Sequence, residues 1–120
     1  MKKHVLVVDD SPTDRQMVTA LLQKEGYAVT TAIDGEDALQ KIAAEQPPLI
    51  VLDIVLPKMN GYQVLRQLKS APETRNIKVI LVSSKNQEAD KFWGLKQGAD
   101  DYIAKPIPDD ALLTAVARHF

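Results

Sequence analysis

The sequence predicts an α/β protein in which helices cover both faces of a five-stranded, doubly wound parallel sheet, giving three αβα layers. Three observations predict this class. Short apolar runs alternate five times with longer segments of helical periodicity. Val and Ile dominate three of these runs, which suits strands buried on both faces. The length of 120 residues suits one domain, and we expect a single domain over residues 1–120.

The five apolar runs are the expected strands, and a helix is expected after each of them. The strands are His4–Val8, Ala28–Ala32, Leu49–Asp53, Lys78–Ser83 and Asp101–Ala104. The helices begin after Ser11, at Asp34–Gly35, at about Gly61, at about Gln87 and near Pro108. Strict alternation implies parallel strands, and at this length the flavodoxin-like strand order 2-1-3-4-5 is expected.

Local signals mark the ends of the helices and the faces that they bury. Ser11 can cap the first helix, Pro12 suits its first position, and Gly26 ends it. The apolar stripes expected to face the core are Met17, Val18, Leu21 and Leu22, then Ala38, Leu39 and Ile42, then Val64, Leu65 and Leu68, then Phe92 and Leu95, and finally Leu112, Leu113 and Val116. Trp93 is expected to pack in or beside the core, with a partly exposed partner anchor as the alternative. His4 and His119 are expected to be ordinary surface residues.

Composition excludes several classes of protein. The net charge of −1 lacks the strong basic excess that is typical of nucleic-acid-binding proteins. The chain has no cysteine, so disulfides and thiolate metal sites are excluded. The longest apolar runs, such as Leu49–Leu52, are too short to cross a bilayer. The first residues lack the apolar segment of a signal peptide, so we expect a cytoplasmic protein.

Polar side chains follow the strands at their carboxyl ends, where doubly wound sheets bind ligands. Asp9 and Asp10 follow the first strand, Asp53 ends the third, Ser83 ends the fourth, and Lys105 comes directly after the fifth. Three neighbouring carboxylates repel one another unless a cation neutralises them. Carboxylate oxygens suit Mg²⁺, which also binds phosphate groups. The sequence therefore predicts a cation and phosphate site, although each residue taken alone has a plain alternative as a loop, cap or surface residue.

Asp53 is the strongest single candidate for chemistry. It closes the most apolar strand and is followed by Ile54–Leu56, so it lies close to the core, where a lone carboxylate is costly. A carboxylate beside a metal can act as a nucleophile and form an aspartyl phosphate. Lys105 precedes Pro106, and a cis peptide bond there would aim the lysine back across the strand ends. Its ammonium group could then pair with a phosphoryl oxygen.

These residues lie in four segments that together resemble the CheY-like receiver domains of two-component signalling. The segments are Val7–Ser11, Leu52–Gly61, Val82–Ser84 and Asp101–Pro106, and they occur in the family's order and at its spacings. The resemblance extends from about His4 to Phe120. Residues Lys91–Tyr102 look most like the PilH-type regulators of pilus-driven twitching motility.

The resemblance implies a role for each residue of the site. Asp53 would be the phosphoacceptor, and Asp10 and Asp53 would bind Mg²⁺ or Mn²⁺ directly, assisted by Asp9 and by the backbone carbonyl of Val55. Ser83 and Lys105 would engage the phosphoryl group. Tyr102 would be the switch residue that turns inward on activation. The Val55 side chain and Lys85 are expected to influence the lifetime of the phosphoryl group.

The implied function is that of a single-domain response regulator without an output domain, rather than an enzyme with turnover. A sensor histidine kinase, a phosphotransfer protein or a small donor such as acetyl phosphate would phosphorylate Asp53. The signal would leave through the face formed by the fourth helix, the fifth strand and the fifth helix, toward a downstream protein that the sequence does not identify. No membrane insertion or nucleic-acid contact is expected.

Three alternatives remain at this stage. A haloacid-dehalogenase-type phosphohydrolase also uses an aspartate and Mg²⁺, but its second aspartate follows two residues after the nucleophile, and it carries a cap domain. A binding module could keep the fold without phosphorylation, although no member of the expected set is missing. A flavin protein would need a phosphate loop rich in glycine and hydroxyl groups, whereas Asp9–Asp10 would repel an anion.

Overall fold

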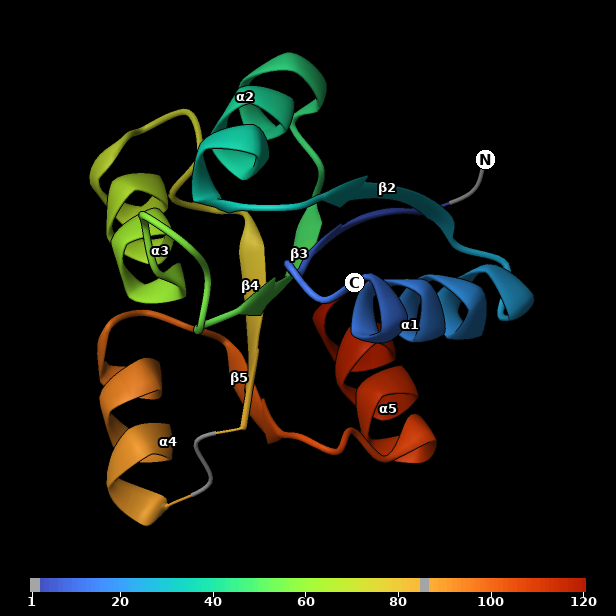
Figure 1. Cartoon of the computed structure of the whole chain (residues 1–120). Helices are drawn as coiled ribbons and strands as arrows, with labels where there is room; N and C mark the ends of the chain where they lie inside the picture. Colours follow the sequence, from blue (N-terminus) through green and yellow to red (C-terminus); the bar gives the residue numbers. More distant parts are fainter. Residues whose placement is uncertain (1–2, 85–86) are drawn as a thin grey trace.

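A computed structural model describes residues 3–84 and 87–120, which form one parallel sheet between two layers of helices (Figure 1). Lys85 lies outside the described residues. The strands are β1 (His4–Val8), β2 (Ala28–Ala32), β3 (Leu49–Asp53), β4 (Lys78–Ser83) and β5 (Asp101–Ala104). All four pairings are parallel, and the strand order is β2-β1-β3-β4-β5. The predicted fold class, strand bounds and strand order are confirmed.

Five helices follow the strands in alternation. They are α1 (Pro12–Lys24), α2 (Gly35–Glu45), α3 (Gly61–Ser70), α4 (Glu88–Lys96) and α5 (Asp109–His119). The first three begin with side-chain caps, in which Ser11, Asp34 and Asn60 each accept a hydrogen bond from the backbone N–H three residues later. The predicted helix starts are therefore confirmed to within a residue or two.

The sheet separates two apolar cores because successive residues of each strand point to opposite faces. Val5 and Val7 of β1 face α1 and α5, and they pack with Leu22 and Leu112. Leu6 and Val8 face α2 and α3. Figure 1 shows the same division, with α1 and α5 on one side of the sheet and α2, α3 and α4 on the other. Nearly every residue of β1, β3 and β4 is buried, as predicted for central parallel strands.

The predicted face of α4 is wrong, and so is one residue of the predicted face of α1. Met17 of α1 is 56% exposed, whereas Val18 and Leu22 are buried. In α4, Phe92, Trp93 and Leu95 are all exposed, at 64%, 49% and 40%. The residue that α4 does bury is Gly94. The helix therefore approaches the sheet along a side without large apolar residues, and the search for an apolar stripe selected the opposite side.

The two histidines also differ from the prediction of ordinary surface residues. His4 is half-buried, hydrogen-bonds Thr30, and lies 3.3 Å from Glu45 (Nε2 to Oε1). His119 lies 3.4 Å from Asp101 (Nε2 to Oδ2). These carboxylates are far from the histidines in the sequence, so no local spacing indicated them.

Candidate functional site

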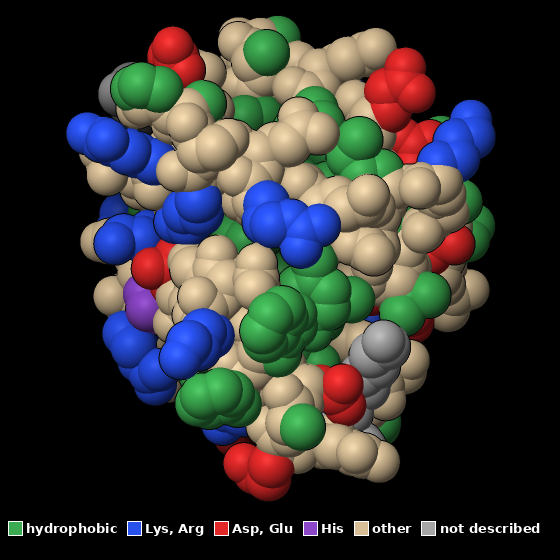
Figure 2. Space-filling model, turned by 90° about the vertical axis from the view of Figure 1, so that its left-hand side faces the viewer, with side chains coloured by type: hydrophobic (Ala, Val, Ile, Leu, Met, Phe, Trp, Pro, Cys, Tyr) green, Lys and Arg blue, Asp and Glu red, His purple; other side chains and the backbone are tan. Residues whose placement is uncertain are grey.

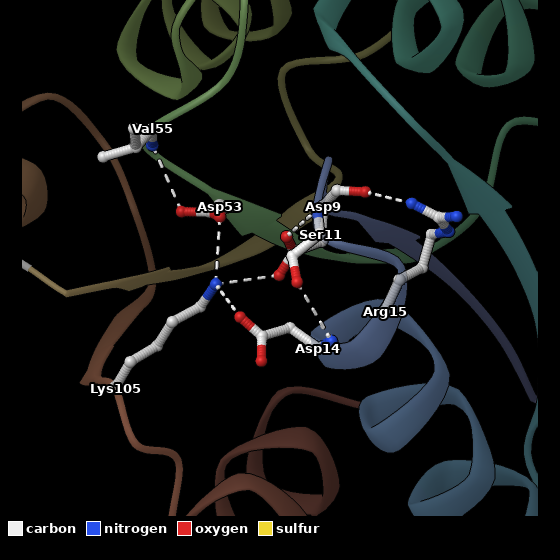
Figure 3. A network of polar contacts seen from close by, with 7 residues as sticks. All are labelled: Asp9, Ser11, Asp14, Arg15, Asp53, Val55 and Lys105. Carbon is white, nitrogen blue, oxygen red and sulfur yellow. Dashed lines mark hydrogen bonds and ion pairs between the residues drawn. The ribbon is translucent and has the colours of Figure 1, made fainter.

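The carboxyl ends of β1, β3 and β5 bring the candidate residues to one edge of the sheet. The strand order reverses between β1 and β3, since the chain proceeds from β1 to β2 on one side and to β3 on the other. Asp9 directly follows β1, and Asp53 is the last residue of β3. Lys105 follows β5 and forms a cis peptide bond with Pro106, as predicted. In Figure 3 its side chain reaches across this edge toward both aspartates.

The Lys105 ammonium group lies among three carboxylates. Its Nζ atom is 2.9 Å from Asp9 Oδ2, 3.0 Å from Asp53 Oδ2 and 2.9 Å from Asp14 Oδ2 (Figure 3). An ammonium group has three N–H donors, so these contacts use all of them. The Asp9 and Asp53 side chains are 3% and 6% exposed, and such buried charges require a charged partner.

The backbone fixes the remaining oxygens of the two buried aspartates. Asp53 Oδ1 accepts a hydrogen bond from the Val55 N–H at 3.1 Å, and Asp9 Oδ1 accepts one from the Ser11 N–H at 2.9 Å. The Arg15 guanidinium donates to the Asp9 carbonyl at 2.8 Å. Each carboxylate therefore keeps one oxygen on the backbone and presents the other to Lys105.

Gly61 holds α3 against the strand that ends in Asp53. Its N–H donates to the Ile54 carbonyl at 2.8 Å. A Cβ atom at this position would lie 2.4 Å from the Asp53 carbonyl oxygen and 2.8 Å from Ile54 Cα, which is closer than atoms pack. The absence of a side chain therefore permits the contact that supports the loop after Asp53.

A group of carboxylates suited to a divalent cation is present at the same edge. Asp9, Asp10 and Asp53 each offer an oxygen, and the three oxygens lie within 4.8 Å of one another. Asp10 is exposed, whereas the other two are buried. Oxygen donors of this kind bind Mg²⁺ through one or two carboxylates, with water completing the shell. The sequence prediction that these three residues converge is thus met in the described part of the chain.

Burial and ion pairing act in opposite directions on the charges of the site. Burial raises the pKa of Asp53 above its ordinary value, and the neighbouring Lys105 opposes this only in part. Burial alone would lower the pKa of Lys105, but hydrogen bonds to Asp9, Asp14 and Asp53 outweigh it and raise that pKa instead. The ammonium is therefore firmly charged, while the charge on Asp53 is energetically costly.

The other two predicted side chains form a buried layer beneath the site. Ser83 is fully buried at the end of β4, and Tyr102 on β5 is 7% exposed. Burial raises the pKa of Tyr102, and a hydrogen bond involving Ser83 opposes the shift. Tyr102 thus already occupies an inward position. The Val55 side chain is 53% exposed, and its carbonyl remains a predicted ligand.

Asp14 and Arg15 are site residues that the sequence analysis did not select. Asp14 is an acidic residue in the first turn of a helix, where carboxylates are common for their effect on the helix dipole. The available signal was its place just after the acidic pair, at the start of the helix that begins at the same edge. Sequence alone does not show that this turn points toward Lys105, which is 91 residues away.

Comparison with known proteins decides the family. The sequence profile of the response regulator receiver domain matches residues 5–117. The chain belongs to the receiver domain family. Its members are phosphoacceptor signalling modules rather than classical enzymes, which favours this interpretation over the phosphohydrolase and flavin alternatives.

Protein PilH of Pseudomonas aeruginosa is 45% identical over 112 residues, covering 93% of each chain. Several other relatives of this receiver domain are longer proteins, of which the chain spans 26–44%.

Solved structures agree with the family and the fold. A putative response regulator from Chloroflexus aurantiacus superposes on the receiver domain with a TM-score of 0.95, at 30% identity, over 99% of this chain and 98% of that one. The receiver domain of the sensor histidine kinase PA1611 from P. aeruginosa, which has a magnesium ion coordinated in its active site cleft, gives a TM-score of 0.89 at 27% identity, over 98% and 97% of the two chains. Within the described residues of the receiver domain studied here, no helix is both long and apolar enough to span a bilayer.

Proposed function

We propose that this receiver domain accepts a phosphoryl group on the Asp53 carboxylate from a phosphohistidine of a sensor kinase or phosphotransfer protein. The observation that carries the proposal is the contact of a buried carboxylate with an ammonium group at the edge where Asp9 and Asp10 also lie. This combination provides a nucleophilic oxygen, a cation for phosphoryl oxygens and a set of oxygen ligands within one site.

The carboxylates fit a divalent cation, Mg²⁺ or Mn²⁺. Three of them lie close together, and the single charge of Lys105 does not neutralise them. We propose that Asp10 and Asp53 bind the cation directly, that Asp9 assists, and that the Val55 carbonyl completes the protein ligands. When bound, the cation would supply positive charge against the oxygens of the transferring phosphoryl group. The magnesium ion in the related PA1611 receiver domain supports this assignment.

The residues of this chain position and stabilise the transferring group. Once Lys105 leaves it, Asp53 Oδ2 would attack phosphorus, the P–N bond to the donor imidazole would break, and that nitrogen would keep the electron pair, with a proton taken up from water if the other ring nitrogen carries none. Lys105 would move from Asp53 Oδ2 to a phosphoryl oxygen. Water would later hydrolyse the acyl phosphate and return the carboxylate.

We propose that the effect of phosphorylation is transmitted from β5 to α4. Tyr102 lies on β5, and its ring packs so tightly against α4 that a Cβ on Gly94 would be 2.9 Å from its Cδ2 atom. We propose that Ser83 and Tyr102 pass the state of Asp53 to the face of α4, β5 and α5. If these contacts differ between two states of the domain, phosphorylation of Asp53 can shift the equilibrium between those states.

Motility or chemotaxis-type signalling in the cytoplasm is the pathway we propose. The similarity to PilH over nearly the whole chain supports it, as do residues 91–102, which look most like that type of regulator.

Phosphorylation of the intact protein tests the proposal. Wild type and Asp53→Ala are incubated with acetyl phosphate and Mg²⁺, and separately with a competent kinase, and their intact masses are measured. We expect one added phosphoryl group on wild type and none on the variant. No gain on wild type with either donor would instead support a binding module that works without phosphorylation. Turnover of phosphate monoesters would support a hydrolase.

A further inference from the structure

Asp14 differs from the other two carboxylates that hold Lys105. It lies 2.9 Å from the ammonium group, as Asp9 does, but its side chain is 39% exposed, against 3% and 6% for Asp9 and Asp53. It also lies outside the group of carboxylate oxygens suited to a cation. Asp14 is therefore a charge at the mouth of the site, fixed by the lysine on which phosphoryl recognition depends.

The position of Asp14 changes the charge that an approaching phosphodonor meets. The carboxylates of Asp9, Asp10 and Asp53, the Lys105 ammonium and a divalent cation together sum to zero. Asp14 adds one negative charge at the rim and occupies one donor of Lys105. A small anionic donor is therefore repelled by Asp14 and finds the lysine partly engaged.

Among the residues that the structure describes, Lys105 is the only basic side chain that lines the surface beside Asp14. A hollow of about 320 Å³ is lined by Asp14, Met17, Val18, Ser84, Lys105, Pro106 and Ile107. Asp14 and Lys105 share its polar part. An anion in this hollow lies beside the Asp14 carboxylate, and the nearest described ammonium group, that of Lys105, is already paired with it.

We propose that Asp14 is a specificity-determining residue that slows phosphorylation by small anionic phosphodonors and so favours a protein donor. This inference rests on the proposed phosphorylation of Asp53. A protein donor would contact the surface around the site and would present its phosphohistidine in place, so its reaction would depend less on the charge at the rim. An ordinary helix-start carboxylate, the simpler role, would affect stability but not the choice of donor.

The test compares Asp14→Asn with wild type, using two small donors and two salt concentrations. Acetyl phosphate carries about two negative charges at neutral pH and phosphoramidate about one. We expect Asp14→Asn to be phosphorylated roughly three- to tenfold faster by acetyl phosphate at low salt, and less than threefold faster by phosphoramidate. For both donors, the ratio of the Asp14→Asn rate to the wild-type rate should approach one at about 1 M salt, where the Debye length is about 3 Å.

Controls separate this effect from general charge and from folding. Glu36→Gln removes an exposed first-turn carboxylate of α2, a helix that supplies no contact to Lys105 among the described residues, and should leave both rates unchanged. Binding of the phosphoryl mimic trifluoroberyllate, followed by ¹⁹F NMR, gives a readout without turnover and should be tighter in Asp14→Asn. Thermal unfolding confirms that each variant is folded.

The outcomes distinguish the inference from the proposed function. Equal or slower phosphorylation of Asp14→Asn, or a gain that salt and donor charge do not alter, overturns the role of Asp14 while wild-type phosphorylation still stands. Absence of a mass gain in wild type and Asp14→Asn with small donors and kinase alike overturns the phosphoacceptor function itself. A mass gain of one phosphoryl group in Asp53→Ala would also overturn the phosphoacceptor function.

Discussion

At the scale of single residues, Lys105 and Asp53 form an ion pair in which the buried aspartate charge is unfavourable for folding. Lys105 is held in the charged form by three carboxylates, whereas burial makes the Asp53 carboxylate costly to ionise. Functional sites commonly sacrifice stability in this way. Asp53 therefore opposes folding at neutral pH, although it lies among residues that otherwise form the core.

The stability of Asp53→Asn tests this claim. The pKa of Asp53 is raised in the folded state, so its contribution favours folding when the carboxyl is protonated and is lost as the pH rises through that pKa. Asn resembles the protonated form at every pH. In the presence of a chelator we expect the variant to be more stable than wild type at pH 7, by on the order of 1 kcal/mol, with a difference that shrinks as the pH falls through the Asp53 pKa.

Urea unfolding at a series of pH values measures this difference. Glu36→Gln, which removes an exposed carboxylate, should show no comparable gain at pH 7. A variant Asp53→Asn that is less stable than wild type at pH 7 would mean that pairing with Lys105 outweighs the cost of burial.

The residue-scale predictions from sequence succeeded where strand ends decide the position. Asp9, Asp53 and Lys105 meet because parallel strands end at one edge, and this follows from chain order alone. Asp14 was missed because its contact depends on the direction of a helical turn relative to a distant lysine. His4 and His119 were misjudged for the same reason, since their partners are also distant in sequence.

At the scale of elements, α4 is the helix that departs most from its sequence pattern. Phe92, Trp93 and Leu95 point outward, and Gly94 packs against Leu81 and Tyr102. Figure 2, which faces the side of α3 and α4, shows hydrophobic side chains gathered there, with lysines and arginines above and to the left of them. Hydrophobic periodicity predicts burial only when the apolar side of a helix faces the core, and in α4 the large apolar side chains are exposed.

The Gly94→Ala variant tests how closely α4 packs. In an open helix this change would stabilise the fold by about 1 kcal/mol. Here the new Cβ would lie 2.9 Å from Tyr102 Cδ2 and 3.0 Å from Leu81 Cδ1. We expect the overpacking to reduce the free energy of unfolding by about 1–3 kcal/mol, as measured by urea denaturation.

Leu95→Ala is the matched control on the same helix. Because Leu95 is 40% exposed, its loss should cost less than about 1 kcal/mol. A Gly94→Ala protein as stable as wild type would show that α4 can move away from β5 without cost, and the proposed route from Tyr102 to α4 would lose its basis.

At the scale of the whole molecule, the fold was predictable because independent signals agree. Alternation of strand and helix sets the parallel sheet, and the burial of β1, β3 and β4 matches their apolar sequences. The sheet in turn places the site, since β1 and β3 flank the point where the strand order reverses. Exposed faces were not predictable in this way, because nothing in a single sequence separates an apolar residue kept for packing from one kept for contact.

The most direct measurement is to locate the phosphoryl group within the chain. Protein treated with acetyl phosphate or a kinase, with Mg²⁺ or with a chelator, is reduced with borohydride, which converts an aspartyl phosphate to homoserine, and its peptides are sequenced by mass spectrometry. We predict homoserine at position 53 alone, and only when the divalent cation is present. Homoserine at position 9, 10 or 14, or equal labelling in the chelator, would contradict the assignment of Asp53 as the cation-dependent acceptor.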